Sequence, residues 1–360
     1  MADARAILLK QYKLCKRCSE RHGGTGTKSD QCYICRGLLD DLDAIAEKIA
    51  NSVKSYEFET FLIGATLPTQ IYEREDALRA RLKIRGMESA KSQLTRELGM
   101  RLARILKKSV EYMRPDVMIN LTIDKENCVD ITIKSRPLAV AGRYVKKIRG
   151  IPQKQDRCPS CEGKGCDSCN HSGLSGYDSV EGVIAKGLIE MTGGQTPKFS
   201  WIGSEDRSSL VLGSGRPFYA HIFNPKKRRL KKKQIRKTGV HATVSVIKEE
   251  PQLQPRFKVK TRIHVKCEKA ITKEDIKNLG ALAGAEVSFE NKYKTATKKI
   301  HSARTRRIDG SQLALTIVAD GGLMIKQFVG GEEYMKPNVS EIIGAKCECT
   351  TFDVLDVSLQ

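Results

Sequence analysis

The 360-residue chain is 40% hydrophobic and 29% charged, a composition typical of a soluble globular protein with two or three domains. No apolar run approaches the length of a membrane span, and the first residues lack the apolar core and cleavage site of a signal peptide. We therefore expect no membrane association and a cytoplasmic location. The formal net charge of +22 is more than solubility requires and favours a nucleic acid as partner.

The N-terminal segment carries two CxxC pairs that predict a zinc site. Cys15 and Cys18 form the first pair, and Cys32 and Cys35 form the second. Four thiolates complete a closed tetrahedral site with no open position, so the zinc is expected to be structural. The alternatives are four unligated thiols, or a site in which His22 replaces one cysteine. We assign residues 1–37 to this zinc-binding module.

The next segment, 38–149, is predicted to form an α+β domain. Apolar residues recur at helical spacing over 38–55, and two alternating segments, 116–124 and 128–134, are joined by a short turn that is typical of a hairpin. Between them lie a predicted strand, 58–68, and two predicted helices, 69–83 and 88–108.

A second cysteine-rich segment, 150–173, interrupts the pattern with Pro and Gly. Its core, CPSCEGKGCDSC, resembles one unit of the zinc repeat of DnaJ-type chaperones, although that family has several such repeats. Only four residues separate its two CxxC pairs, so the segment is either a second zinc knuckle or a linker without metal. The ligands of this second zinc would be Cys158, Cys161, Cys166 and Cys169.

Residues 174–360 are predicted to form a mixed α/β domain with a mainly antiparallel sheet. Ser179 is placed to cap a helix that begins at Val180, and Thr272 and Asp275 have the spacing of a capping box at the start of a second helix. The predicted strands are 208–224, 239–248, 256–267, 284–290, 312–319 and 347–357.

The run KKRRLKKKQIRK, residues 226–237, carries nine of the positive charges. Such a run is either a solvated loop or a segment that binds the phosphates of a nucleic acid.

The motifs of nucleotide-driven, dinucleotide-dependent, α/β-hydrolase and HExxH metalloprotease enzymes are absent from the sequence. The remaining chemical group of interest is the acidic pair Glu205 and Asp206, which follows the probable strand KFSWIG and precedes the glycines of LGSGRPF. A carboxylate in such a loop can act as a nucleophile or base. The pair can equally be an ordinary solvated turn.

The blocks RYVKKIRGIPQ (143–153), GSEDRSSLVLGSGRPF (203–218) and GGLMIKQFVGG (321–331), together with both cysteine segments, resemble the archaeal and eukaryotic tRNA pseudouridine synthases of the Pus-ten family. The resemblance implies a zinc and THUMP RNA-binding module joined to a pseudouridine synthase domain. It implies a cofactor-free reaction, with Asp206 as the catalytic residue and Glu205 as the acid before it. The expected substrate is the T-arm of tRNA, at uridines 54 and 55, and the expected enzyme is a monomer.

The same resemblance supplies further site residues. Lys326 is the expected partner of Asp206, although a lysine on a surface helix would look the same. Ile317 would be an apolar contact of the site or simply core, and Arg216 would contact a phosphate or a carboxylate.

Two tyrosines expected from the family are missing. Met324 stands at one of these positions, and Thr261 or Arg262 occupies the neighbourhood of the other, so we assign Met324 and Arg262 to substrate binding. Their loss favours a rival interpretation, a non-catalytic zinc-containing protein that binds RNA or acts as a tRNA chaperone.

Overall fold

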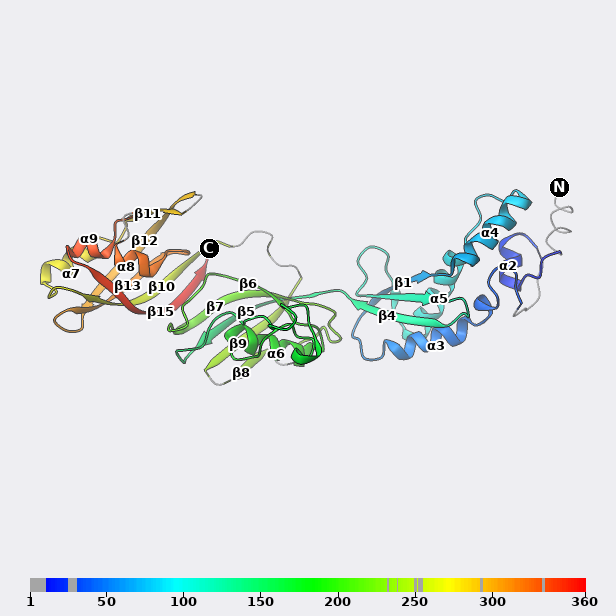
Figure 1. Cartoon of the computed structure of the whole chain (residues 1–360), viewed down its shortest axis with the longest axis horizontal. Coiled ribbons are helices and arrows are strands. Elements are labelled where there is room, and N and C mark those ends of the chain that lie inside the picture. Colours follow the sequence, from blue (N-terminus) through cyan, green and yellow to red (C-terminus); the bar gives the residue numbers. More distant parts are fainter. Residues whose placement is uncertain are drawn as a thin grey trace. The chain divides into compact units, whose positions relative to one another are not determined.

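A computed structural model describes residues 11–24, 31–231, 233–237, 239–248, 251, 255–291, 294–331 and 334–360. The chain divides into two compact units, drawn in Figure 1 with every helix and strand in its sequence colour. Unit 1 comprises Met1–Pro137 and Asn224–Arg228, and unit 2 comprises Leu138–Phe223 and Arg229–Gln360. Lys232 of the basic run and residues 25–30, between the first two CxxC pairs, lie outside the described residues. No described helix has the length and apolar character needed to cross a membrane.

Unit 1 has a four-stranded sheet with helices packed against it. Its strand order is β2-β1-β3-β4, in which β1 runs parallel to β2 and β3 while β4 is antiparallel to β3. The predicted helices, strand and hairpin are confirmed. The elements are α2 (Lys16–Arg21), η1 (Leu38–Asp40), α3 (Leu42–Ser52), β1 (Thr60–Thr66), α4 (Thr69–Leu82), α5 (Ala90–Leu106), β2 (Ser109–Val110), β3 (Val117–Ile123) and β4 (Val129–Ser135).

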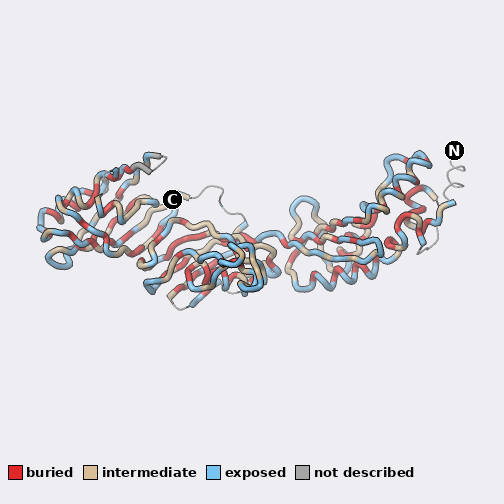
Figure 2. The backbone as a smooth tube through the Cα atoms, in the orientation of Figure 1, coloured by how far each residue is buried: buried red, intermediate tan, exposed pale blue. Residues whose placement is uncertain are grey.

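The cysteine-rich N-terminus shares one hydrophobic core with this sheet. Cys15 and Cys35 belong to the same buried cluster as Leu94 of α5 and Ile119 of β3. Alternate residues of β3 are buried, and Figure 2 shows the same alternation along other strands. The expected zinc module and the expected domain after it are therefore packed as a single unit.

A buried ion pair ties the helices of unit 1 together. Arg21 of α2 donates from Nη2 to Glu75 Oε1 of α4 at 2.7 Å, and both side chains are 3% exposed. The same carboxylate accepts the backbone N–H of Ala90 at the start of α5. One carboxylate thus joins three helices. Removing it would leave the buried Arg21 guanidinium without its acidic partner.

Unit 2 contains one large sheet. Its strand order in the described residues is β14-β11-β12-β13-β10-β15-β7-β5-β9-β8, with β6 beside β7. The strands that neighbour one another are antiparallel except β7 and β15, which run parallel. The strands are β5 (Leu138–Lys146), β6 (Lys198–Trp201), β7 (Val211–Ile222), β8 (Gln234–Lys237), β9 (Val240–Ile247), β10 (Phe257–Cys267), β11 (Glu286–Asn291), β12 (Lys294–Arg307), β13 (Gln312–Asp320), β14 (Met335–Lys336) and β15 (Cys347–Leu359).

Two groups of helices cover this sheet, each over its own core. α6 (Val180–Thr192) packs near β8 and β9, whereas α7 (Lys273–Gly280), α8 (Ile325–Gly330) and α9 (Val339–Ile343) lie near β12 and β15. A short helix, η2 (Asp167–Cys169), lies in the second cysteine segment. The predicted caps are confirmed: Ser179 accepts the N–H of Gly182, and Thr272 and Asp275 form a capping box.

Strand β5 belongs to unit 2, so the boundary between the units differs from the expected one. It pairs with β7 and β9, and its residues Leu138, Val140 and Tyr144 belong to the core under α6. The boundary therefore lies at 137/138 and not at the expected 149/150, and the second cysteine segment is part of unit 2. The run LAVAGRYV is apolar enough for a buried strand, and it could have indicated β5 from the sequence.

Candidate active site

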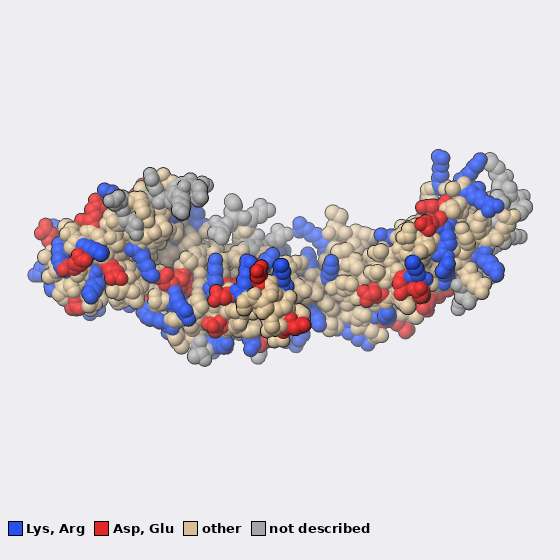
Figure 3. Space-filling view, in the orientation of Figure 1, with Lys and Arg blue, Asp and Glu red and all other residues tan. Residues whose placement is uncertain are grey.

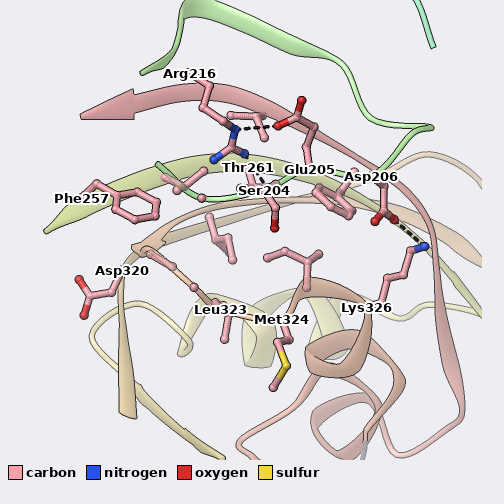
Figure 4. A pocket seen from close by; sticks show the side chains of 18 of the residues that line it. Ser204, Glu205, Asp206, Arg216, Phe257, Thr261, Asp320, Leu323, Met324 and Lys326 are labelled. Atoms are coloured by element: carbon pink, nitrogen blue, oxygen red, sulfur yellow. Dashed lines mark hydrogen bonds and ion pairs between the residues drawn. The ribbon is translucent and has the colours of Figure 1, made fainter. Parts of the chain in front are cut away.

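A cavity of about 420 Å³ lies in unit 2 between the β6–β7 loop and the turn before α8. Strands β10, β13 and β15 form its floor, which includes the buried side chains of Thr261 and Ile317. Figure 4 shows Glu205, Asp206 and Arg216 on one side of this cavity and Met324 and Lys326 on the other. The sequence segments 203–216 and 322–326, more than one hundred residues apart, are thus brought together.

Asp206 and Lys326 form an ion pair at the mouth of the cavity. The Lys326 Nζ lies 2.5 Å from Asp206 Oδ2, and the two side chains are 60% and 36% exposed. The hydrogen bond to this carboxylate raises the pKa of the Lys326 ammonium above its ordinary value. The predicted pairing of these residues is therefore present in the geometry, with the Asp206 carboxylate still open to the cavity.

Glu205 has the opposite environment. Its side chain is fully buried, and its two oxygens accept hydrogen bonds from the Tyr144 hydroxyl at 2.7 and 2.8 Å. The Arg216 Nε lies 2.8 Å from Oε2, and the Lys146 Nζ lies 3.9 Å from Oε1. Burial and the nearby Glu205 carboxylate hold the pKa of Tyr144 well above its ordinary range, so this hydroxyl is a neutral donor. Arg216, predicted to contact a phosphate or a carboxylate, contacts this carboxylate.

Arg216 also fixes the backbone of the β6–β7 loop. Its Nη1 donates to the carbonyl of Ile202 at 2.9 Å, and its Nη2 donates to the carbonyl of Ser204 at 3.0 Å. Gly203 between them has φ +77°, and a Cβ there would come within 2.5 Å of the Arg216 Nη1. The glycine is needed both for its backbone conformation and for the close approach of the guanidinium.

The remaining donors come from the junction between β5 and α6. Lys146, which is 0% exposed, donates from Nζ to the carbonyls of Asp206 at 3.0 Å and Ile151 at 2.9 Å. Gln153 donates to the Tyr144 hydroxyl at 2.9 Å and to the carbonyl of Gly203 at 3.3 Å. Burial lowers the pKa of Lys146, while the neighbouring Glu205 carboxylate opposes that effect. Positively charged or amide donors thus hold successive carbonyls of the loop.

The far end of the loop is fixed in the same way. Arg149 donates from Nη1 to the carbonyl of Ser208 at 2.5 Å, and its guanidinium makes a bidentate pair with Asp353 at 2.7 and 2.8 Å. Asp353, on β15, also accepts the N–H of Leu210 at 3.0 Å. The block RYVKKIRGIPQ was interpreted from sequence only as a family signature, so the roles of Tyr144, Lys146, Arg149 and Gln153 were missed.

Most of the predicted site residues line the cavity, but Arg262 does not. The side chain of Arg262 is exposed, whereas its neighbour Thr261 is buried in the cavity floor. Successive residues of a strand point to opposite faces, so only one of the two can reach the site. The sequence analysis also missed Phe257, which lines the cavity four residues before Thr261 on the same strand.

The first cysteine cluster has a geometry that fits zinc. Four sulfurs at 2.3 Å from a tetrahedral zinc ion lie about 3.8 Å apart. The Sγ atoms of Cys15 and Cys35 are 3.6 Å apart, and those of all four cysteines lie within 4.8 Å of one another. His22 is not in this group of possible ligands: its Nδ1 lies 2.7 Å from the carbonyl oxygen of Cys18, and its Nε2 lies 3.5 Å from the Arg79 Nε.

The second cluster fits the same ion. Its Sγ separations are 3.9 Å for Cys158–Cys166, 3.9 Å for Cys161–Cys169 and 3.7 Å for Cys166–Cys169. The backbone N–H of Cys166 lowers the pKa of the Cys169 thiol to about 6, which favours the thiolate that a metal requires. Both clusters could therefore hold structural zinc.

Comparison with known proteins identifies the family of this chain. The sequence matches the family described as "Pus10, C-terminal" over residues 139–358 and the "Pus10 THUMP domain, archaeal" over residues 45–122. It is 33% identical to the "tRNA pseudouridine synthase Pus10" of Nitrosopumilus maritimus, over 98% of this chain and 97% of that protein. The protein of the same description from Methanocaldococcus jannaschii is 32% identical, over 92% of this chain and 76% of that protein.

Among solved structures, one that is described as "Structure of H/ACA RNP bound to a substrate RNA containing 2'-deoxyuridine" is similar at a TM-score of 0.31 and 10% identity, over 59% of this chain and 46% of that chain. A score this low identifies no shared fold. The sequence matches define an RNA-modifying enzyme with a THUMP domain. The chain belongs to the Pus10 family of tRNA pseudouridine synthases.

Proposed function

We propose that this protein converts uridine to pseudouridine in the T-loop of tRNA, at positions 54 and 55, with Asp206 as the catalytic residue and without a cofactor. The observation that carries the proposal is the Asp206 carboxylate, which is open to the cavity and paired with Lys326 while its own backbone carbonyl is held by a buried lysine. Unit 2 would then have the pseudouridine synthase fold.

The cavity supplies what a flipped uridine requires. Its walls include the apolar side chains of Phe257, Ile317, Leu323 and Met324, against which a base extruded from the RNA can pack. Phe257 offers the aromatic ring that the missing tyrosines would otherwise provide. This ring weakens the argument for a protein that only binds RNA.

In the proposed reaction Asp206 either attacks C1′ of the uridine or removes a neighbouring proton. The bond from N1 to C1′ breaks, the base rotates, and a bond from C5 to C1′ forms. C5 then loses its proton and N1 gains one, so the reaction is an isomerisation that consumes no cofactor. Lys326, whose Nζ pairs with this carboxylate, orients it for this step.

The remaining assignments follow from the same proposal. The two cysteine clusters would hold structural zinc ions, with Cys15, Cys18, Cys32 and Cys35 as ligands of one and the second set as ligands of the other. The protein would act as a cytoplasmic monomer on the T-arm of tRNA.

The test is to incubate the protein with an unmodified tRNA transcript and to map pseudouridine by carbodiimide-dependent primer extension. We expect stops at the two T-loop positions with the wild type and none with Asp206→Asn. Asp156→Asn, which changes an exposed aspartate outside the cavity, is the matched control and should retain the stops. Equal signals from Asp206→Asn and wild type would refute the catalytic assignment, and no signal from any form would favour the RNA-binding or chaperone interpretation.

A further inference from the structure

A second cavity, which we call the β5–β9 groove, lies in unit 2 on the face of β5, β7, β8 and β9 that α6 does not cover. Its volume is about 710 Å³. Side chains of successive residues in a strand point to opposite faces, and this separates the groove from the active site. Tyr144 and Arg216 contact the active-site loop, whereas their neighbours Arg143 and Pro217 line the groove.

The groove carries positive charge without acidic residues. Over the face of the molecule seen in Figure 3, Asp and Glu side chains lie between those of Lys and Arg. By contrast, no Asp or Glu occurs among the described residues that line the groove, although Arg143, Lys233 and Arg236 do. A lining of this kind attracts a polyanion. The Asp356 carboxylate, which does not line the groove, accepts a hydrogen bond from the lining residue Ser214.

The structure divides the basic run 226–237 into two parts with different roles. Arg228 belongs to unit 1, where its Nη1 donates to the carbonyl of Arg136 at 2.7 Å and to the Ser135 hydroxyl at 3.2 Å. Lys233 and Arg236 instead lie on the exposed side of the sheet edge formed by β8 and line the groove. Only this second part is available for a ligand in the groove.

The floor and wall of the groove suit unpaired nucleotides. Ala141, Thr243 and Ser245 are small and leave the sheet surface open to a flat ligand, and Tyr219 adds an aromatic ring beside them. Positive side chains next to an aromatic residue on an open sheet are the elements with which proteins bind single-stranded RNA.

We propose that the β5–β9 groove binds an unpaired segment of the tRNA substrate other than the loop that enters the active site. The proposal rests on the proposed function for the identity of the RNA. Since the groove and the active site are on opposite faces of β5 and β7, the uridine in the active site and the nucleotides in the groove belong to different parts of the RNA.

The test is the affinity of the full-length protein for a tRNA transcript across a salt series, with the variant Lys233→Gln/Arg236→Gln. Two lost phosphate contacts reduce the slope of log K against log salt by about 1.4 and weaken binding roughly tenfold at about 150 mM salt. Affinity for an isolated T-arm hairpin should be unchanged. Pseudouridine formation at saturating tRNA should also be unchanged, because neither side chain lines the active site.

The matched control is Lys231→Gln/Lys237→Gln, which removes the same charge from the same run but from exposed residues outside the groove. This control should lose much less affinity. An equal loss in the control, an equal loss on the hairpin, or an unchanged salt slope in Lys233→Gln/Arg236→Gln would overturn the proposal. If the wild type formed no pseudouridine, the proposed function would fail while the affinity series would still test the groove.

Discussion

Two adjacent carboxylates occupy opposite regions of the active site. Glu205 lies in what we call the back wall, formed with Tyr144, Lys146 and Arg216, where its side chain is fully buried. Asp206 lies at the mouth, where its side chain is 36% exposed and its partner Lys326 is 60% exposed. These two consecutive residues are thus a carboxylate bound by protein groups and a carboxylate that remains open to a ligand.

The difference separates a carboxylate with a structural role from the one that is proposed to react. A buried charge is tolerated only when it is paired and hydrogen-bonded. Removing any residue of the back wall would therefore lower the stability of the fold strongly. The mouth gains little stability from an exposed ion pair. We therefore expect substitutions in the back wall to change stability and substitutions at the mouth to change the reaction rate.

The largest expected effect is that of Arg216→Met. This change leaves the buried Glu205 carboxylate without its closest positive partner and frees two loop carbonyls. We expect the free energy of unfolding of unit 2 to fall by about 3–5 kcal/mol. Trp201, the only tryptophan, packs 5.6 Å from both Tyr144 and Phe218 and is a fluorescence probe of this unit in urea unfolding.

The double variant Arg216→Met/Glu205→Gln is the control for that experiment. Removing both charges should recover part of the lost stability, because no unpaired charge is left in the core. A single-variant loss below about 1 kcal/mol would mean that the back wall does not depend on this pair.

The second prediction concerns Lys146→Met. The change keeps the length of the side chain but removes the donor to the carbonyls of Asp206 and Ile151, so the loop that carries the proposed catalytic carboxylate is no longer held in place. We expect the single-turnover rate of pseudouridine formation to fall about 100-fold, with tRNA affinity unchanged. Lys147→Met, at the exposed neighbouring position, should have no effect. A loss of affinity in place of rate would contradict a positioning role for Lys146.

The sequence predicted much of the fold because its signals were local. Capping residues such as Ser179 and Thr272, and the alternation over 312–319, depend on neighbours a few residues away. The strand β12 was missed because charged and other polar residues dominate its sequence. The strand β5 was missed because its paired residues in β7 and β9 lie 65 to 108 positions further along the chain.

The active site was predictable only in part for the same reason. Asp206 and Lys326 could be proposed from family motifs, yet nothing local indicates that Lys146 donates to the carbonyl of a residue 60 positions later. The choice between Thr261 and Arg262 depends on which face of β10 meets the cavity, and that is set by the register with β13. Long-range pairing, which spacing in a single sequence does not reveal, decides both questions.

The third prediction extends the comparison to the far end of the loop. Burial opposes ionisation of Asp353, but hydrogen bonds from Arg149 and from the Leu210 N–H outweigh it and lower the pKa of this carboxyl. A carboxyl whose folded-state pKa is lowered stabilises the fold above its unfolded pKa of about 4 and loses that effect as the pH falls through the folded pKa. Asp353→Asn should therefore cost about 1–2 kcal/mol at pH 5–7, and the difference from wild type should shrink below about pH 4. A difference that does not vary with pH would show that the carboxyl acts through shape and not through charge.

The smallest effect on stability is expected at the mouth, from Lys326→Met. Because the ammonium is largely exposed, the free energy of unfolding should change by less than about 0.5 kcal/mol. The reaction rate should fall about tenfold, since Asp206 loses the positive partner that orients its carboxylate. The pKa of Lys326 is raised, so the ammonium stays charged through neutral pH and the loss of rate should be the same between about pH 6 and 8.

Lys326→Arg keeps the positive charge and should recover most of the rate. If Lys326→Met left the rate unchanged, Lys326 would be an ordinary lysine on a surface helix, and the distinction between a structural back wall and a chemical mouth would rest on Asp206 alone.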